Sequence, residues 1–389
     1  MVFTQAIVLQ SRESDFELCD IEIEEPQPNE VCIRCASWFR WWPAGELELC
    51  PCWLDLALKI QRPPRLCHTD LMVKGNALPG RYPSTIGHEG AGIVKKVGSK
   101  VQRVQEGDSV ILSFASCQHC GPCSVAKPAA CPDWVNMNFL RKRNLDVESK
   151  PAYRLARNGQ GEKEVYGAFF GQSSMARMSL VSESSCVKVS RDLDLKLYAP
   201  LGCGMQTGSG AIFNTLKPTS ESTLAVFGCG AVGMAAILAA KYLGVQTIIA
   251  IDLVQSRLDL ARGLGATHVV VGNDKDVVDQ IRSHTKWNLG VTHAVEATGV
   301  LPVLKTAFES LASFGHLASI GNPGVGITPP FEINDMVNGG KTWSGILMGG
   351  GDPQTVSIPR ESTRAAYAET SHTGPAVPGR SASAREIPD

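Results

Sequence analysis

The sequence predicts a two-domain α/β protein in which a β-rich domain precedes a doubly wound parallel sheet. Three observations predict this class. The 389 residues exceed one ordinary domain. Polar and apolar residues alternate over residues 1–35 and 84–115, which is typical of half-buried strands. From residue 223 to 321, short apolar strands alternate with helical segments, and that alternation indicates βαβ units.

Composition narrows the function classes. Hydrophobic residues make up 43% of the chain and charged residues 19%, so dominant disorder is excluded. The net charge of −1 carries no basic bias toward nucleic acid or an anionic membrane. The N-terminus lacks a signal-peptide pattern, and 13 Cys is an odd number. We therefore expect free or metal-bound thiols in the cytoplasm rather than a disulfide framework.

The N-terminal region reads as three strands, AIVLQ, FELCDIEI and VCIRC. Strand signals resume over residues 84–115, where glycines mark the turns. The polar, basic stretch 136–165 is expected to be a loop. Two regions break the pattern: residues 38–64, which hold four of the seven Trp, and a Ser-, Ala- and Pro-rich tail from about 354.

The segment from 223 to 240 is almost continuously apolar, which is long enough for a membrane helix. Three spaced glycines favour strand, turn and helix instead. They form a G-x-G-x-x-G motif at Gly228, Gly230 and Gly233, between the strand TLAVF and a helix. In a Rossmann fold the first glycine makes the turn, the second admits a pyrophosphate and the third lets helix pack on strand. Val232 and Thr207 are expected beside the same cofactor.

Asp252 ends the next apolar strand, about 20 residues beyond the glycines. Its carboxylate is expected to accept hydrogen bonds from a ribose and to repel a 2′-phosphate, which favours NAD over NADP. Arg257 is expected either to neutralise Asp252 or to contact the adenosine ribose; a solvated helix residue is the alternative.

Four cysteines lie within fifteen residues, which indicates a closed tetrahedral zinc site on one loop. They are Cys117, Cys120, Cys123 and Cys131. An iron–sulfur cluster is the alternative. His119 lies among them, but four thiolates already complete the shell.

A dispersed set offers a second metal site. Cys67, His88 and Cys203 together supply the Cys2His shell of a catalytic zinc with one position open. Taken singly, each is more often an ordinary packed residue. Glu89 is expected near the metal or behind its ligands, and Asp70 is expected to orient a ligand imidazole.

These motifs occur in one order: CHTD, GHEGAGIVKKVGSKV, the four-cysteine lobe, LGCGMQTGSGA and GCGAVG. The chain thereby resembles the zinc-containing alcohol dehydrogenases of the medium-chain dehydrogenase/reductase superfamily over about 1–37 and 65–353. The segment FFGQSSMARMSLVSESSCVKV resembles the aryl-alcohol (benzyl alcohol) branch. The resemblance implies a GroES-like β-rich catalytic domain (1–200, with the lobe at 117–131) and a Rossmann NAD-binding domain (201–345).

The resemblance also implies a mechanism. Catalytic zinc acts as a Lewis acid on a small alcohol or aldehyde, structural zinc fills the lobe, and NAD takes the hydride. Thr69 stands where the family places the hydroxyl that takes the alcohol proton, and His68 where a basic residue contacts the pyrophosphate. Met72 replaces a His that often ends the proton relay. The family further implies a homo-oligomer, dimer or tetramer, without nucleic acid or membrane.

The chain departs from the family in two places. Residues 38–64 are extra, and residues 346–389 form a C-terminal remnant, expected to be disordered from about 354. A translated intron and a frameshifted end explain both; a genuine loop and a divergent tail are the alternative. Three other functions remain open: a glutathione-dependent formaldehyde dehydrogenase, a catalytically dead zinc- and NAD-binding protein, and a zinc-ribbon nucleic-acid module.

Overall fold

The computed structural model describes residues 2–36, 40–41, 47–48, 67–74, 80–140, 143, 151–155 and 163–356. Most of the unusual 38–64 segment and all of the tail from 357 onward lie outside this part of the chain. Two short strands of the segment are described, β4 (Arg40–Trp41) and β5 (Leu47–Glu48), which pair antiparallel with each other.

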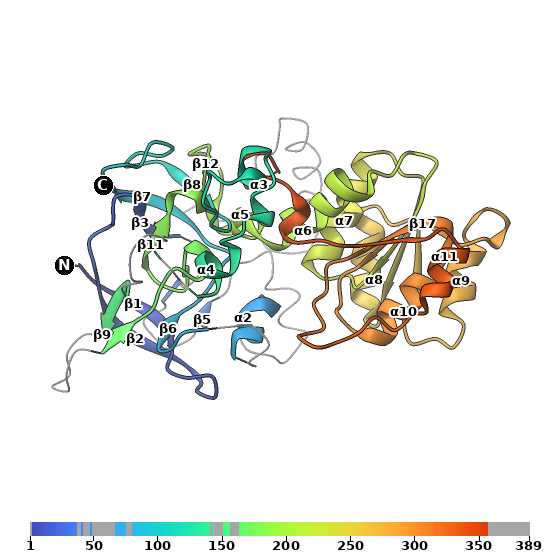
Figure 1. Ribbon diagram of the computed structural model, residues 1–389, viewed down its shortest axis with the longest axis horizontal. Coiled ribbons are helices and arrows are strands. Elements are labelled where there is room, and N and C mark those ends of the chain that lie inside the picture. Colours follow the sequence, from blue (N-terminus) through green and yellow to red (C-terminus); the bar gives the residue numbers. More distant parts are fainter. Residues whose placement is uncertain are drawn as a thin grey trace, which may run out of the picture. The chain divides into compact units, whose positions relative to one another are not determined.

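A six-stranded parallel sheet forms the C-terminal half of the described chain, coloured yellow to orange in Figure 1. Its strand order is β15-β14-β13-β16-β17-β18. The bounds are β13 (Thr223–Phe227), β14 (Thr247–Asp252), β15 (His268–Val271), β16 (Val291–Glu296), β17 (Leu311–Ser319) and β18 (Thr342–Gly345). From β13 the chain adds β14 and β15 on one side of the sheet and β16 to β18 on the other, which is the doubly wound Rossmann arrangement. Ligands of this fold bind at the carboxyl ends of the strands where the order switches, which is beside β13.

Both faces of this sheet are buried because alternate residues of each strand point to opposite sides. In β13, Leu224 and Val226 pack in one core cluster, whereas Ala225 and Phe227 pack in another. The first cluster is covered by α7 (Ala231–Tyr242) and α8 (Gln255–Leu264), and the second by α9 (Val277–Ser283) and α10 (Leu301–Glu309). The apolar stretch beginning at 223 is therefore strand, turn and helix, as the glycines predict. Among the described residues, no helix is long and apolar enough to cross a membrane.

The N-terminal half contains two five-stranded sheets, ordered β10-β9-β2-β1-β6 and β11-β3-β7-β8-β12. The bounds are β1 (Val2–Leu9), β2 (Phe16–Ile23), β3 (Glu30–Cys35), β6 (Ser84–Thr85), β7 (Ala91–Val97), β8 (Ser109–Leu112), β9 (Tyr153–Leu155), β10 (Glu164–Val165), β11 (Met178–Ser182) and β12 (Cys186–Val189). All of their strand pairs are antiparallel, which fits the alternation of polar and apolar residues in the sequence.

One expectation about an irregular region is wrong in part. The expected loop at 136–165 includes β9 and β10, which extend the first sheet from β2. A single buried ring explains this: Tyr153 is fully buried and its hydroxyl lies 2.9 Å from Ser179 Oγ. The described chain ends with α12 (Pro353–Val356), where Gln354 Nε2 donates to Cys186 O at 2.9 Å, and the expected disorder of the tail lies outside the described residues.

Candidate active site

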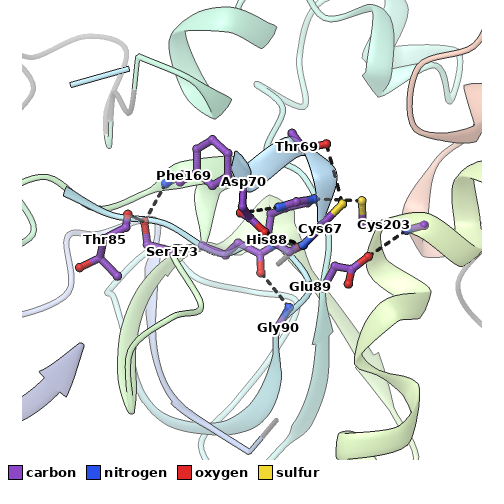
Figure 2. Close-up of polar contacts among 12 residues, drawn as sticks. Cys67, Thr69, Asp70, Thr85, His88, Glu89, Gly90, Phe169, Ser173 and Cys203 are labelled. Atoms are coloured by element: carbon purple, nitrogen blue, oxygen red, sulfur yellow. Dashed lines mark hydrogen bonds and ion pairs between the residues drawn. The ribbon is translucent and has the colours of Figure 1, made fainter. Parts of the chain in front are cut away.

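Three segments far apart in the sequence converge on one metal-binding set (Figure 2). Cys67 lies at the start of α2 (His68–Lys74), His88 lies between β6 and β7, and Cys203 directly precedes α6 (Gly204–Gly210). One ligand atom of each residue lies within 4.8 Å of the other two. Cys203 Sγ is 3.1 Å from His88 Nε2. Tetrahedral zinc with S and N ligands needs donors about 3.5–4 Å apart, so the set fits this metal after a small adjustment.

The His88 imidazole is held from behind. Its Nδ1 lies 3.0 Å from Asp70 Oδ1, and both side chains are essentially inaccessible to solvent. Such a contact leaves Nε2 directed toward the cysteine sulfurs. The His88 backbone is held as well, because Gln172 Nε2 donates to His88 O at 2.8 Å and Gln172 Oε1 accepts from Gly90 N at 3.1 Å.

Sequence reasoning missed Gln172 as a residue that supports the site. Its side chain is fully buried and also donates to Ser113 O, so it joins the backbone of residues 88–90 to that of Ser113. The FFGQSS motif drew attention to this position only as a mark of the branch. The signal that could have identified it is a lone amide inside an otherwise apolar, small-residue run, since a buried amide needs partners.

The two thiols of this set have opposite pKa shifts. Hydrogen bonding from the Cys203 thiol, aided by the nearby His88, places the pKa of Cys67 well below its usual value. The same hydrogen bond, with burial, raises the pKa of Cys203. Both thiols must lose their protons to bind a metal. Glu89 is half-buried beside them, and removal of its carboxyl group from water raises its pKa to about 8.

The other residues expected near this site occupy different positions. Thr69 Oγ1 lies 3.8 Å from Cys67 Sγ, beside the metal-binding set. Glu89 points toward the start of α6, where its Oε1 accepts a hydrogen bond from Gly204 N at 3.3 Å (Figure 2). His68 is exposed at the start of α2, and Met72 is half-buried in the same helix.

The four cysteines of the lobe also converge. One Sγ from each lies within 4.8 Å of the others, and Cys117 Sγ is 4.0 Å from Cys123 Sγ. Zn–S bonds of 2.3 Å at tetrahedral angles place sulfurs about 3.8 Å apart, so four thiolates fit zinc here. Burial raises the pKa of Cys117, but hydrogen bonds from the backbone amides of His119 and Cys120 bring it to about 7. The His119 ring lies 2.7 Å from Cys117 O, outside the sulfur set.

The three motif glycines fit a dinucleotide. Gly228 has φ +90, a conformation that favours glycine, and makes the turn after β13. A Cβ on Gly230 would meet nothing within 4 Å, which leaves this backbone open to a ligand at the start of α7. A Cβ on Gly233 would lie 1.9 Å from Gly228 O, so only glycine lets helix and strand approach this closely. Half-buried Val232 follows Gly230 in the first turn of α7.

Asp252 is fastened at the end of β14. Its Oδ2 accepts from Cys229 N at 2.8 Å and its Oδ1 accepts from Val254 N at 2.9 Å. Arg257 Nη1 lies 3.7 Å from Asp252 Oδ2, so the two charges are close enough to compensate partly. The carboxylate therefore stands beside the glycine turn with a fixed orientation.

Thr207 occupies α6, which links the metal-binding set to the parallel sheet. Its hydroxyl donates to Cys203 O at 2.7 Å, and its side chain is largely buried. A Cβ on Gly208 would lie 2.0 Å from Val232 O, so α6 packs directly against α7. The helix that begins at Cys203 thus also packs against the dinucleotide helix.

A dinucleotide-type sheet beside a Cys–His–Cys set and a four-cysteine lobe defines a metal-binding dehydrogenase. Family models agree: residues 64–191 match the alcohol dehydrogenase GroES-like domain, and residues 231–360 match the zinc-binding dehydrogenase domain. The chain belongs to the zinc-binding alcohol dehydrogenase family.

Several relatives of this chain are named as alcohol dehydrogenases. A probable alcohol dehydrogenase of Pseudomonas sp is 37% identical over 66% of this chain and 79% of the relative. Geraniol dehydrogenase of Castellaniella defragrans is 36% identical over 76% of each protein. Among solved structures, benzyl alcohol dehydrogenase of Acinetobacter calcoaceticus superposes with a TM-score of 0.80 at 35% identity, covering 95% of this chain and 90% of that one.

Proposed function

We propose that this enzyme oxidises a primary, aromatic alcohol to its aldehyde, with zinc and NAD. One observation carries the proposal: Cys67, His88 and Cys203 bring two sulfurs and an imidazole together, and Cys203 begins the helix that packs on the dinucleotide helix. Similarity to geraniol and benzyl alcohol dehydrogenases supports a bulky primary alcohol as substrate.

In this proposal Cys67, His88 and Cys203 hold catalytic zinc, and the four lobe cysteines hold structural zinc. Zinc supplies a Lewis acid that lowers the pKa of an alcohol hydroxyl, and NAD supplies the hydride acceptor. Asp70 keeps the His88 imidazole oriented, and Gly204 N holds Glu89 Oε1 in place beside the cysteine set.

Thr69 is the group that takes the alcohol proton. Its hydroxyl lies 3.8 Å from Cys67 Sγ, so it would stand beside a metal held by this cysteine. Met72 cannot carry the proton onward, because a thioether neither donates nor readily accepts one. The proton therefore leaves through water or another polar group, and His68 is left to contact the cofactor pyrophosphate.

The cofactor is proposed to be NAD. Gly228, Gly230 and Gly233 leave the backbone open for a pyrophosphate at the N-terminus of α7. Asp252 meets the ribose hydroxyls with a negative charge that repels a 2′-phosphate, and Arg257 lies where it can contact the same ribose. Val232 and Thr207 are proposed to line the cofactor's path.

The proposal extends to assembly and location. Large apolar side chains in β17 and between β17 and β18 in the sequence are strongly exposed: Phe314 by 85%, Val325 by 91%, Ile333 by 77% and Val337 by 71%. Exposed large apolar side chains favour association with a second copy, so we propose a homo-oligomer, dimer or tetramer. A cytoplasmic location and the 1–200 and 201–345 domains belong to the same proposal.

Metal content and turnover test this function together. The purified chain is expected to hold two zinc ions, one for each donor set, and to form NADH with benzyl alcohol. Cys67→Ser should remove one zinc ion and abolish NADH formation. A wild-type chain with one zinc ion and no turnover of any primary alcohol would instead support the catalytically dead alternative.

A glutathione-dependent formaldehyde dehydrogenase has less support, because the relatives named for alcohols are 36–37% identical to this chain and S-(hydroxymethyl)glutathione dehydrogenase of Escherichia coli is 34% identical over 73% of it. The comparison that separates the two is direct: kcat/KM for benzyl alcohol against kcat/KM for S-(hydroxymethyl)glutathione. A larger value for the glutathione adduct would reverse the assignment.

A further inference from the structure

Phe170 lies flat against the imidazole of His88. The two ring centroids are 4.6 Å apart and the planes differ by 29°, whereas the neighbouring Phe169 meets the same imidazole edge-on. Phe170 also has a left-handed backbone, with φ 53 and ψ 31. A bulky residue rarely adopts this conformation, so the surroundings must hold it there.

Hydrogen bonds around Phe170 supply that support. Ser173 Oγ accepts from Phe169 N at 2.9 Å and donates to Thr85 O at 2.7 Å (Figure 2). On the other side, Ser185 Oγ donates to Phe170 O at 3.3 Å. Hydrogen bonds thus hold the backbone on both sides of Phe170, whose ring contacts His88.

A second ring connects Phe170 to the four-cysteine lobe. Trp134 meets Phe170 edge-on, with centroids 6.0 Å apart and planes at 90°. Its backbone N donates to Cys131 O at 2.9 Å, so Trp134 is attached to the last cysteine of the lobe. Phe114 packs on Trp134 at 4.7 Å and completes the contact.

We propose that Phe170 is a positioning residue that fixes the plane of the metal-binding His88 imidazole, and that Trp134 extends this control to the lobe. The hydrogen bond that His88 Nδ1 donates to Asp70 directs one ring nitrogen but leaves the ring free to tilt about that axis. A flat ring against the imidazole removes this freedom. The inference rests on the proposed function, because it requires a metal at Cys67, His88 and Cys203.

Cobalt substitution tests the proposal without relying on turnover. Cobalt replaces zinc in the full chain, and the absorption of the Cys67-containing site is identified as the part lost in Cys67→Ser. We expect Phe170→Leu to shift that absorption and to speed removal of the metal by a chelator by about tenfold, as for other residues behind a metal ligand. Bands of the four-cysteine site should not move.

Phe308→Leu is the matched control. Phe308 is equally buried and stacks flat on Phe331 at 4.0 Å, but it belongs to the core of the parallel sheet. This variant should lose stability without changing either cobalt spectrum. If Phe170→Leu behaves like Phe308→Leu, with unchanged absorption and chelation rate, the positioning role is overturned.

Trp134→Phe tests the link to the lobe and serves if Phe170→Leu does not fold. It should shift the same absorption in the same direction by a smaller amount, and an unchanged spectrum would contradict the link. Failure of the proposed function looks different: wild-type absorption would then be insensitive to Cys67→Ser.

Discussion

Asp70 Oδ1 lies 3.0 Å from His88 Nδ1, and neither side chain exposes more than 1% of its surface. Burial disfavours the charged form of this carboxylate and raises the pKa of Asp70. The neighbouring His88 opposes this effect only in part. The imidazole in turn has its pKa raised by Asp70 and Cys67 against the effect of burial. The two residues are thus mutually stabilised in a place where either alone would be costly.

Asp70→Asn should weaken zinc binding at the Cys67, His88 and Cys203 set by about 10- to 100-fold, because the carboxylate that orients the imidazole is lost. Competition with a chromogenic chelator measures the affinity. Asp108→Asn is the control: Asp108 is also buried, but it pairs with Lys188 at 2.7 Å and not with a residue of the donor set. Equal zinc affinity in wild type and Asp70→Asn would contradict the assignment.

Asp252→Asn should narrow the preference for NAD over NADP, since removing the charge removes the repulsion of a 2′-phosphate. The measurement is kcat/KM with each cofactor at saturating alcohol. Arg257→Gln, which keeps the carboxylate, should leave NADP excluded. Better use of NADP than of NAD by the wild-type enzyme would sink the assignment of Asp252.

Cys120→Ser should remove the zinc ion of the lobe and lower the free energy of unfolding by several kcal/mol, because structural zinc contributes folding free energy directly. Elemental analysis and denaturant unfolding check both effects. Cys19→Ser, in β2 and outside both sulfur sets, should change neither. Unaltered zinc content in Cys120→Ser would show that the four-cysteine assignment is wrong.

Arg143→Met should destabilise the β-rich region by about 3–5 kcal/mol, the usual effect of leaving buried charges unpaired. Arg143 is 1% exposed, and its guanidinium donates to Glu30 at 2.6 and 2.7 Å and to Glu24 at 3.0 Å. Denaturant unfolding measures the loss. Lys305→Met removes the exposed pair with Glu309, at 3.7 Å, and should cost little. Similar effects of the two variants would contradict the burial argument.

Deleting residues 38–64 should raise solubility and zinc occupancy at Cys67. The segment carries Trp38, Trp41, Trp42 and Trp53 without polar alternation, and such residues promote association when exposed together. It also ends a few residues before Cys67, whose position requires a rigid frame. Zinc content and benzyl alcohol oxidation of the two forms are compared. Equal values would show that the segment is a tolerated loop, as slow growth of closure entropy permits.

Much of the fold follows from local sequence. The parallel sheet was predictable because strands such as TLAVF and TIIAID are continuously apolar and are separated by helix-length segments. The pairing of β9 with β10 was not predictable, because the surrounding stretch is polar and the strands depend on one contact with a distant residue, the burial of Tyr153 against Ser179. A single contact between residues far apart in the sequence produces no periodic pattern of polar and apolar residues.

The candidate metal-binding residues were predictable to different degrees. Cys117 to Cys131 lie on one loop, so their spacing alone indicates a shell, whereas Cys67, His88 and Cys203 are far apart in the sequence and could be grouped only by their residue types and, more firmly, by the resemblance. The roles of Gln172 and Phe170 could not be predicted. Both act through contacts with His88 that depend on how the turn after Ala168 folds, with its left-handed residues at 168, 170 and 173.

The bonding of Asp252 has a consequence for how such an enzyme changes cofactor. Its two oxygens already accept hydrogen bonds from the amides of Cys229 and Val254, so the carboxylate stabilises the turn in addition to its proposed contact with the ribose. A substitution of Asp252 that admits a 2′-phosphate also leaves the amides of Cys229 and Val254 without their acceptors. The change in cofactor specificity is therefore accompanied by a loss of stability in the turn. Evolution or design must therefore first supply other acceptors for those amides, which makes the order of mutations matter.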